Sequence, residues 1–393
     1  MTGKKHTGKA GRLYFLDNLK VFIIFLVIVF HAGYVYESGG FLSFLWIVDD
    51  PSKNDLAGII NLILDMFMMP TLFFISGYFA PMSLRSQKGF AFLRSRFKRL
   101  MVPWIIAILT LIPFYKLIFL VSRNLPQEQL VSYFHFSGEI MLNQGWLWFL
   151  PVLFLFDTLY FLLSKVVPTG FRPNLKLTVI AVFLISVGYS FSMSYWGLSG
   201  WTKTVLLDFQ NERLLIYFML FILGSQLNLH HVFSTTPGSR KLYYLANATI
   251  WIPMNLYVVF VLNLIFKPGS HIISRIGDLV VLWTSFHLSV LGLLFILINT
   301  FRYFLNRKGR LSTALGQYSY GVYIIHFIVM GAIAMLLLNV SLSSTAKLAV
   351  LSISTFVACN LILLLYKGAS CRLSKRAGFV VVQRPIQGAS SRV

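Results

Sequence analysis

Apolar runs of about 20 residues recur along the whole chain, and they restrict its fold more than any other feature. A helix needs about 20 predominantly apolar residues to cross a hydrocarbon layer of about 30 Å. Of the 393 residues, 57% are hydrophobic and only 12% are charged. We therefore predict an all-α, polytopic integral membrane protein with about ten transmembrane helices. The expected spans are 13–36, 56–81, 100–122, 146–167, 177–195, 213–229, 245–266, 278–301, 316–339 and 346–366.

The spans predict one membrane domain between two short basic tails. The domain covers residues 13–366, and the tails are 1–12 and 367–393. No repeat of fixed period appears, and no connecting segment is long enough to fold by itself. We expect the first run to be a retained span rather than a cleaved signal peptide, because cleavage after Ala32 would place Phe30 where a small residue is needed.

The distribution of charge predicts how the spans are oriented. Lys and Arg concentrate in the cytoplasmic loops of membrane proteins. With the N-terminus inside, the cytoplasmic segments and their span edges hold 25 of the 34 Lys and Arg and none of the 12 Asp and Glu. We therefore predict that both termini are cytoplasmic and that the formal charge of +22 is mostly a topology signal. The basic loops fit contact with membrane lipids, and no soluble domain exists to bind nucleic acid.

The first span carries ionisable residues on an otherwise apolar helix. At about 100° per residue, Asp17, Lys20 and His31 share one stripe. An ionisable group in hydrocarbon costs several kcal/mol unless it faces the protein interior or a wet cavity. The stripe therefore predicts an enclosed polar cavity that Asp17 helps to line.

Other spans contribute polar side chains that we expect to line the same cavity. In the ninth span, three of them recur at intervals of four and three residues, which places them on one helix face. In the second span, a serine and the adjacent Gly77 predict a close approach of a neighbouring helix. These candidates are Asp65, Ser76, His287, Ser319, Tyr323 and His326.

A basic segment before the third span is a candidate phosphate site. Arg96 and Arg99 lie three residues apart, so on a helix both guanidinium groups would point the same way. Paired guanidiniums bind phosphate oxygens through parallel hydrogen bonds. The bias of basic residues toward the cytoplasm explains the same pattern, and the two interpretations stay open. Cys359 and Cys371 form neither a disulfide framework nor a metal motif, and we expect no metal.

Four segments together resemble the membrane-bound acyltransferase 3 family, in its stand-alone type that includes glucan-modifying and O-acetylating enzymes. The segments are FLDNLKVFIIFLVIVFH with Lys20 and His31, MPTLFFISGYF, RSRFKRLMVP with Arg96 and Arg99, and WFL at 148–150 followed by SYGVYIIH at 319–326. One difference from the family is Lys20, where an arginine is common, because lysine lacks the planar two-pronged donor.

The resemblance implies an O-acyltransferase of the plasma membrane, here a bacterial inner membrane. It would move an acyl group, of acetyl or succinyl type, from cytoplasmic acyl-CoA to a hydroxyl of an extracytoplasmic or membrane-linked saccharide. Arg96 and Arg99 would bind the phosphates of acyl-CoA, and Lys20 would bind its arm or its thioester. His31 would be the catalytic base and Asp65 its orienting partner. The family also includes members with an outer hydrolase-like domain, so a separate extracytoplasmic partner protein is an expected alternative here.

Two other classes of function remain open from the residues. Buried Asp, Lys and His also mark the pathways of ion-coupled transporters and of lipid or saccharide flippases. The absence of a visible inverted repeat in the sequence argues against a transporter. A non-catalytic scaffold for polysaccharide assembly is the third alternative.

Overall fold

The prediction of a polytopic all-α membrane protein is confirmed. The computed structural model describes residues 13–38, 46–87, 89–126, 144–168, 171–234 and 238–376, and within these it contains ten helical segments long and apolar enough to cross a membrane. The α-helices are α1 (Tyr14–Tyr36), α2 (Asp55–Ser86), α3 (Phe90–Ser122), α5 (Phe149–Val166), α6 (Leu175–Tyr195), α7 (Leu214–Leu229), α8 (Arg240–Thr249), α9 (Trp251–Phe266), α10 (Arg275–Phe304), α11 (Arg310–Leu337) and α12 (Ser344–Arg376).

Several helix ends differ from the expected spans. Helix α3 begins at Phe90 rather than at residue 100, so Arg96 and Arg99 lie within it. The expected span 245–266 is two helices, α8 and α9, and the third residue of α9 is Pro253. A proline near the start of a helix is tolerated there because its missing N–H would have no partner in the helix. Helix α12 continues to Arg376, and the predicted tails at 1–12 and beyond 376 lie outside the described residues.

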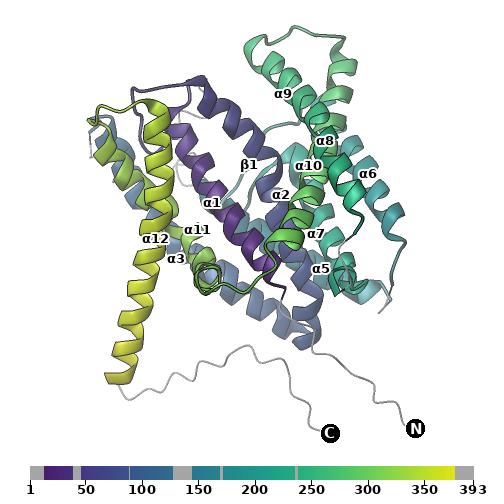
Figure 1. The fold of residues 1–393 in the computed structure, drawn as a ribbon, viewed down its shortest axis with the longest axis horizontal. Coiled ribbons are helices and arrows are strands. Elements are labelled where there is room, and N and C mark those ends of the chain that lie inside the picture. The colour runs from purple at the N-terminus through teal and green to yellow at the C-terminus, as the bar shows by residue number, and fades with distance from the viewer. Residues whose placement is uncertain are drawn as a thin grey trace.

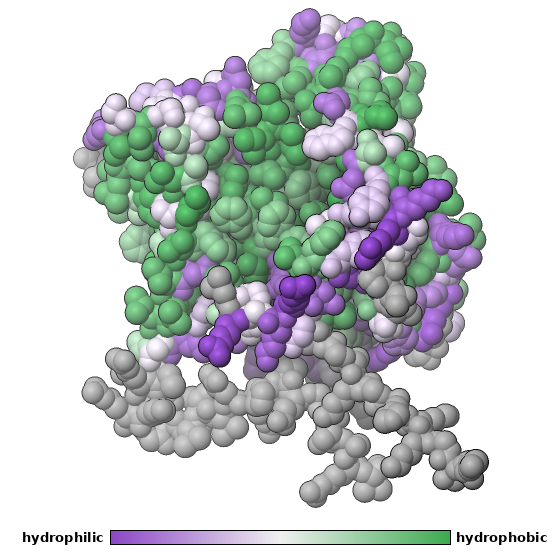
Figure 2. Space-filling view, viewed as in Figure 1, coloured by the Kyte–Doolittle hydropathy of each residue, from purple (hydrophilic) through white to green (hydrophobic). Residues whose placement is uncertain are grey.

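Helix α1 is the centre of the molecule. It packs against α2, α10, α11 and α12, and Figure 1 shows it crossing the middle of the structure. Leu16, Leu19, Ile23 and Ile28 on this helix are fully buried. The face shown in Figure 2 is largely apolar, with hydrophilic residues gathered at its lower centre and along its right side. This pattern fits a bundle whose sides face lipid.

Helices α2 and α7 approach so closely that only glycine fits between them. A Cβ atom at Gly77 would lie 1.9 Å from the carbonyl oxygen of Phe221, and one at Gly224 would lie 2.2 Å from that of Phe74. Small residues allow backbones to approach in membrane helix packing. The close helix approach predicted at Gly77 is therefore confirmed.

A short antiparallel hairpin covers one end of the bundle. Its strands are β1 (Trp201–Lys203) and β2 (Asp208–Gln210), with Trp201 opposite Gln210. Asp208 accepts hydrogen bonds from the backbone N–H groups of Thr204, at 3.1 Å, and of Gln144, at 3.0 Å. Burial raises the pKa of the Asp208 carboxyl. These bonds fix the hairpin against the 3-10 helix η2 (Gly145–Trp148), which begins directly after Gln144.

A second 3-10 helix, η3 (Asn211–Arg213), anchors the other side of the hairpin. The carboxylate of Glu212 accepts a hydrogen bond from the backbone N–H of Gly200 and another from the side chain of Gln210, each at 2.8 Å. The hydroxyl of Ser190 on α6 donates to the carbonyl oxygen of Glu212 at 2.6 Å. The hairpin is thus tied to both η2 and α6, and we expect it to be rigid.

A buried ion pair ties the last helix to the segment that follows α1. The Nζ atom of Lys347 on α12 lies 2.9 Å from a carboxylate oxygen of Asp50, and the two side chains are 2% and 1% exposed. Lys347 also donates to the carbonyl oxygen of Leu338. The segment from Trp46 to Lys53 has no helix or strand, so this pair fixes its position.

Candidate active site

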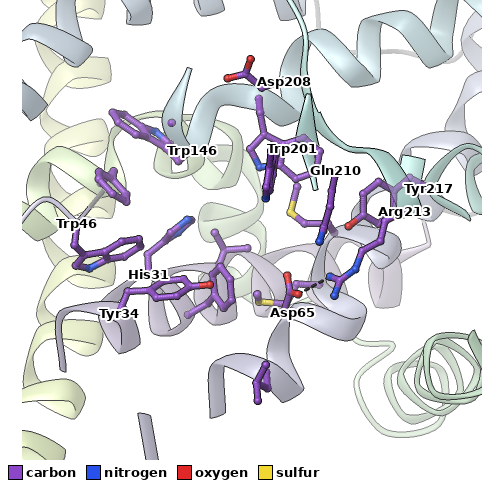
Figure 3. A pocket seen from close by; sticks show the side chains of 18 of the residues that line it. His31, Tyr34, Trp46, Asp65, Trp146, Trp201, Asp208, Gln210, Arg213 and Tyr217 are labelled. Carbon is purple, nitrogen blue, oxygen red and sulfur yellow. Dashed lines mark hydrogen bonds and ion pairs between the residues drawn. The ribbon is translucent and has the colours of Figure 1, made fainter. Parts of the chain in front are cut away.

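A cavity of about 620 Å³ lies beneath the hairpin, where α1, α2, α9 and α11 converge. Its wall is rich in aromatic side chains, and Figure 3 shows several of them around a shared space. Pockets of this size with an apolar wall and a few polar groups are typical of small-molecule sites. The tryptophans in the wall are Trp46, Trp146, Trp148 and Trp201.

His31 on α1 lies in the wall of this cavity. Its ring projects toward the open space, as Figure 3 shows, and it is half-buried. The Nδ1 atom of His31 lies 3.0 Å from Nε2 of His326 on α11. The indole of Trp46 lies nearly parallel to the His31 ring, with the centroids 6.2 Å apart, and Phe327 meets it edge-on at 5.3 Å. One side of His31 is therefore packed and the other faces the cavity.

Helix α11 contributes the support behind His31. Tyr323 lines the cavity, and its hydroxyl donates a hydrogen bond to the backbone oxygen of Trp146. The Nδ1 atom of His326 lies 2.7 Å from the carbonyl oxygen of Tyr323, and the ring of His326 is fully buried. Two of the three candidates on this helix face therefore meet at the site. The third, Ser319, hydrogen-bonds to the carbonyl oxygen of Gly316 at 3.0 Å and lies outside the cavity wall.

Asp65 on α2 faces the same cavity, but its charged partner is Arg213. The two form an ion pair, drawn in Figure 3, and Arg213 also donates to the hydroxyl of Tyr257 at 2.9 Å. The guanidinium lies over the ring of Phe286, 4.6 Å from its centroid. His31, in contrast, has its side-chain hydrogen-bond contact with His326. The geometry thus gives His31 and Asp65 separate partners.

Sequence analysis did not single out Arg213 or the wall tryptophans. Arg213 is the first residue of the expected sixth span and follows Glu212, and this pair of opposite charges at a span edge was a usable signal. Trp146 and Trp148 fit the aromatic belt of a membrane interface equally well by sequence. Only the folding of η2 against the bundle turns them toward the cavity.

The comparison that decides the family is a match over nearly the whole membrane region. A family model described as an acyltransferase domain matches residues 13–364. The chain belongs to the acyltransferase 3 family. Among curated proteins it is similar to glucans biosynthesis protein C of Escherichia coli (strain SMS-3-5 / SECEC) and of Shigella dysenteriae serotype 1 (strain Sd197). Each is 27% identical over 191 residues, 46% of this chain and 48% of the relative. The chain thus spans about half the length of the curated relatives it matches, and no solved structure matches it.

The arginines that match the acyltransferase 3 motif lie on α3, away from the cavity wall. The Nε atom of Arg96 lies 3.5 Å from a carboxylate oxygen of Asp157 on α5, whose side chain is 1% exposed. The side chain of Arg99 is exposed, and its backbone oxygen accepts a hydrogen bond from the hydroxyl of Tyr320 at 2.6 Å. The described cavity wall includes neither arginine.

The other candidate residues from the sequence also lie outside the wall. Helix α1 contributes residues from Val27 onward to the wall, and the half-buried Asp17 and Lys20 lie nearer its start. Ser76 is half-buried on α2. His287 is buried between α10 and α6, where its Nδ1 lies 2.7 Å from the carbonyl oxygen of Trp283 and its Nε2 lies 3.3 Å from the hydroxyl of Ser190.

Within the described residues, no group of three or more His, Cys, Asp or Glu side chains is arranged to hold a metal ion.

Proposed function

We propose that this chain is an integral membrane O-acyltransferase that transfers an acyl group from acyl-CoA to a hydroxyl of a saccharide-type acceptor. The observation that carries the proposal is His31 in the wall of a large aromatic cavity, on the first span of a chain from the acyltransferase 3 family. An imidazole is suited to proton transfer because its ordinary pKa lies near neutrality.

The acceptor would occupy the cavity. Tryptophan and tyrosine rings provide flat apolar faces against which the C–H faces of a sugar ring can pack. Polar side chains at the same wall, including Asp65 and Gln210, can bind its hydroxyl groups. The name of the similar relatives refers to glucans, which agrees with an acceptor of this class. Asp65, held by Arg213, would then act as an acceptor-binding residue.

The donor would bind at the cytoplasmic end of α3. Arg96 and Arg99 supply positive charge for the phosphates of acyl-CoA. Helix α11 links this region to the cavity, since Tyr320 contacts the backbone of Arg99, Tyr323 lines the cavity and His326 contacts His31. From Tyr320 to His326 the helix rises about 9 Å, at about 1.5 Å per residue. The long arm of acyl-CoA would follow this path, with Lys20 nearer its start.

The reaction needs one proton acceptor and one leaving group. His31 would take the proton of the acceptor hydroxyl while the oxygen attacks the carbonyl carbon of the thioester. The new C–O bond forms, the C–S bond breaks, and the departing thiolate receives a proton, which yields an ester and coenzyme A. General base catalysis of this kind contributes about 10²- to 10⁴-fold in rate. The tryptophans of the wall would exclude water, which otherwise competes as the acceptor.

The decisive experiment replaces the base. In cells with His31→Ala, we expect acylation of lipid and polysaccharide extracts, measured by mass spectrometry, to fall to the level of cells without the protein. Immunoblots of the membrane fraction should show the same amount of protein as the wild type. Undiminished acylation by the variant would reject His31 as the base.

The proposed donor site is tested by measuring the binding of acetyl-CoA, without any measurement of acyl transfer. Acetyl-CoA should raise the melting temperature of the purified wild-type protein, because a ligand of the folded state stabilises it. The double variant Arg96→Ala/Arg99→Ala should lose most of this increase. Lys241→Ala, a basic residue on α8, is the matched control and should keep it. Equal losses in both variants would mean that the arginines on α3 are topology signals only.

A further inference from the structure

His31 and His326 form part of a chain of contacts that ends on the backbone of α11. Nδ1 of His31 meets Nε2 of His326 at 3.0 Å, and Nδ1 of His326 meets the carbonyl oxygen of Tyr323 at 2.7 Å. Both distances are those of hydrogen bonds. The His326 ring also has a hydrogen bond to the backbone oxygen of Val322, so its contacts are one imidazole nitrogen and two backbone carbonyl oxygens.

The carbonyl of Tyr323, at the end of these contacts, determines which ring nitrogens of the two histidines carry protons. A carbonyl oxygen can only accept a hydrogen bond, so Nδ1 of His326 must carry the proton. In a neutral imidazole the other nitrogen is then an acceptor, so Nε2 of His326 accepts. Its partner, Nδ1 of His31, must donate. Nε2 of a neutral His31 is consequently left without a proton.

We propose that His326 is a positioning residue that fixes neutral His31 as its Nδ1–H tautomer, with Nε2 of His31 as the proton acceptor toward the cavity. The proposal rests on the acyl transfer proposed above only for its use in catalysis. The tautomer itself follows from the contacts. A residue that holds a catalytic imidazole in one tautomer and one orientation is usually a carboxylate, whereas here a second imidazole backed by a peptide carbonyl has that role.

The surroundings of His326 keep this arrangement in place. The ring is fully buried, so water does not compete for its nitrogens. The Tyr323 hydroxyl is bound to the backbone oxygen of Trp146, which fixes the turn of α11 that carries the accepting carbonyl. When His31 gains a proton at Nε2, its Nδ1–H bond to His326 becomes charge-assisted and stronger.

A second histidine in the same protein shows what sets this pair apart. On α10, Nδ1 of His287 also meets a backbone carbonyl, that of Trp283, at 2.7 Å. Its Nε2, however, meets the hydroxyl of Ser190, and His287 lies outside the cavity wall. Both His287 and His326 contact a backbone carbonyl through Nδ1, but of the two it is His326 that contacts the imidazole of His31 through Nε2. His287 therefore provides a matched control.

The tautomer is measured directly by nitrogen NMR. The full chain, labelled with ¹⁵N-histidine and reconstituted in lipid nanodiscs, gives distinct shifts for protonated and unprotonated ring nitrogens, and the His31 signals are identified by their loss in His31→Gln. We expect neutral His31 to carry its proton on Nδ1 in the wild type and in His287→Gln. The ring of His31 also has a hydrogen bond to the backbone oxygen of Val27, and this acceptor remains when His326 is replaced. In His326→Leu, which offers no acceptor of its own, we therefore expect a larger share of the Nε2–H form that free imidazoles favour than in the wild type. An Nε2–H tautomer in the wild type, or an unchanged tautomer in His326→Leu, would overturn the inference.

The catalytic use of the tautomer is measured as the rate of acetyl transfer from acetyl-CoA to gluco-oligosaccharides. His326→Leu should lower the maximal rate about 100-fold, within the range that a general base contributes, with little change in the acceptor concentration for half-maximal rate. His326→Gln should recover at least a tenth of the wild-type rate, because its amide oxygen can accept from Nδ1 of His31. A His326→Leu enzyme as fast as the wild type would contradict the role. If the wild type itself transfers no acetyl group to any acceptor, the proposed function fails, and the NMR result alone decides the tautomer.

Discussion

Arg213 carries a buried guanidinium in the cavity wall, and we expect its loss to destabilise the protein. It is 5% exposed and contacts the carboxylate of Asp65, the hydroxyl of Tyr257 and the ring of Phe286. Removing one partner of a buried ion pair leaves the other charge uncompensated, which costs about 3 to 5 kcal/mol. Because Asp65 is about one-third exposed, we expect the lower end of that range.

This expectation is tested by thermal denaturation of purified variants in detergent. Arg213→Met should lower the free energy of unfolding by about 3 kcal/mol, and the double variant Asp65→Asn/Arg213→Met should recover part of the loss. The recovery is diagnostic, since it shows that the uncompensated carboxylate causes the damage. If the double variant were less stable than Arg213→Met, the pair would not be coupled in this way.

At the residue scale, the sequence indicated helix faces but not the partners across them. Tyr323 and His326 were expected on one face of a helix with His31 in the same cavity, because helical periodicity is a local property. The contact between His31 and His326, and the pairing of Asp65 with Arg213, join residues far apart in the chain. Which of several buried charges pair depends on how the spans pack, and no local pattern specifies that.

At the scale of helices, the crossing of α2 and α7 holds the cavity wall together. Asp65 belongs to α2, and Arg213 directly precedes α7, so the distance between these helices decides whether the pair forms. Gly77→Ala would place a Cβ atom 1.9 Å from the backbone oxygen of Phe221. Because the clash is with the backbone, a change of side-chain rotamer cannot remove it. We expect the helices to separate, with a loss of stability of at least about 1 to 3 kcal/mol.

The control for this substitution is a glycine on a lipid-facing helix. At Gly188 on α6 a Cβ atom would meet nothing within 4 Å, so Gly188→Ala should be neutral or stabilising by up to about 1 kcal/mol. Melting temperatures of both variants, measured side by side, separate a packing effect from a general effect of alanine. A Gly77→Ala protein as stable as Gly188→Ala would show that α2 and α7 can shift apart without cost.

The spans were predictable and several of their ends were not, for a physical reason. Mean hydropathy over a window detects the part of a helix that lies in hydrocarbon. Helix α3 extends beyond that part through a basic segment, and α12 does so beyond residue 366. Polar residues outside the membrane can continue a helix without any apolar signal. The division of the expected span 245–266 between α8 and α9 likewise could not be predicted from hydropathy.

At the scale of the whole molecule, the last helix contacts the segment that follows the first helix, near the cavity. The ion pair between Lys347 and Asp50 joins α12 to the segment that carries Trp46 over His31. Burial of the pair excludes water, so its attraction is stronger than that of a surface pair. The last helix therefore supports the cavity wall without contributing a residue to it, and we expect truncation before α12 to displace Trp46.

The acyl transfer we propose requires that the cavity and the basic end of α3 face opposite sides of the membrane. Charge distribution predicts that Lys241 lies on the cytoplasmic side and Lys203, on the hairpin beside the cavity, on the other side. In a background with Cys359→Ser and Cys371→Ser, each lysine is replaced singly by cysteine. A maleimide that cannot cross membranes is then applied to intact bacterial cells whose outer membrane has been permeabilised.

Lys203→Cys should react in these cells, and Lys241→Cys should react only after the inner membrane is lysed. The pattern follows from the preference of Lys and Arg for cytoplasmic loops, which acts on the insertion of every span. The reverse pattern would place His31 on the same side as cytoplasmic metabolites and Arg96 on the other side. Acyl-CoA made in the cytoplasm would then have no access to these arginines, and the proposed direction of transfer would have to be abandoned.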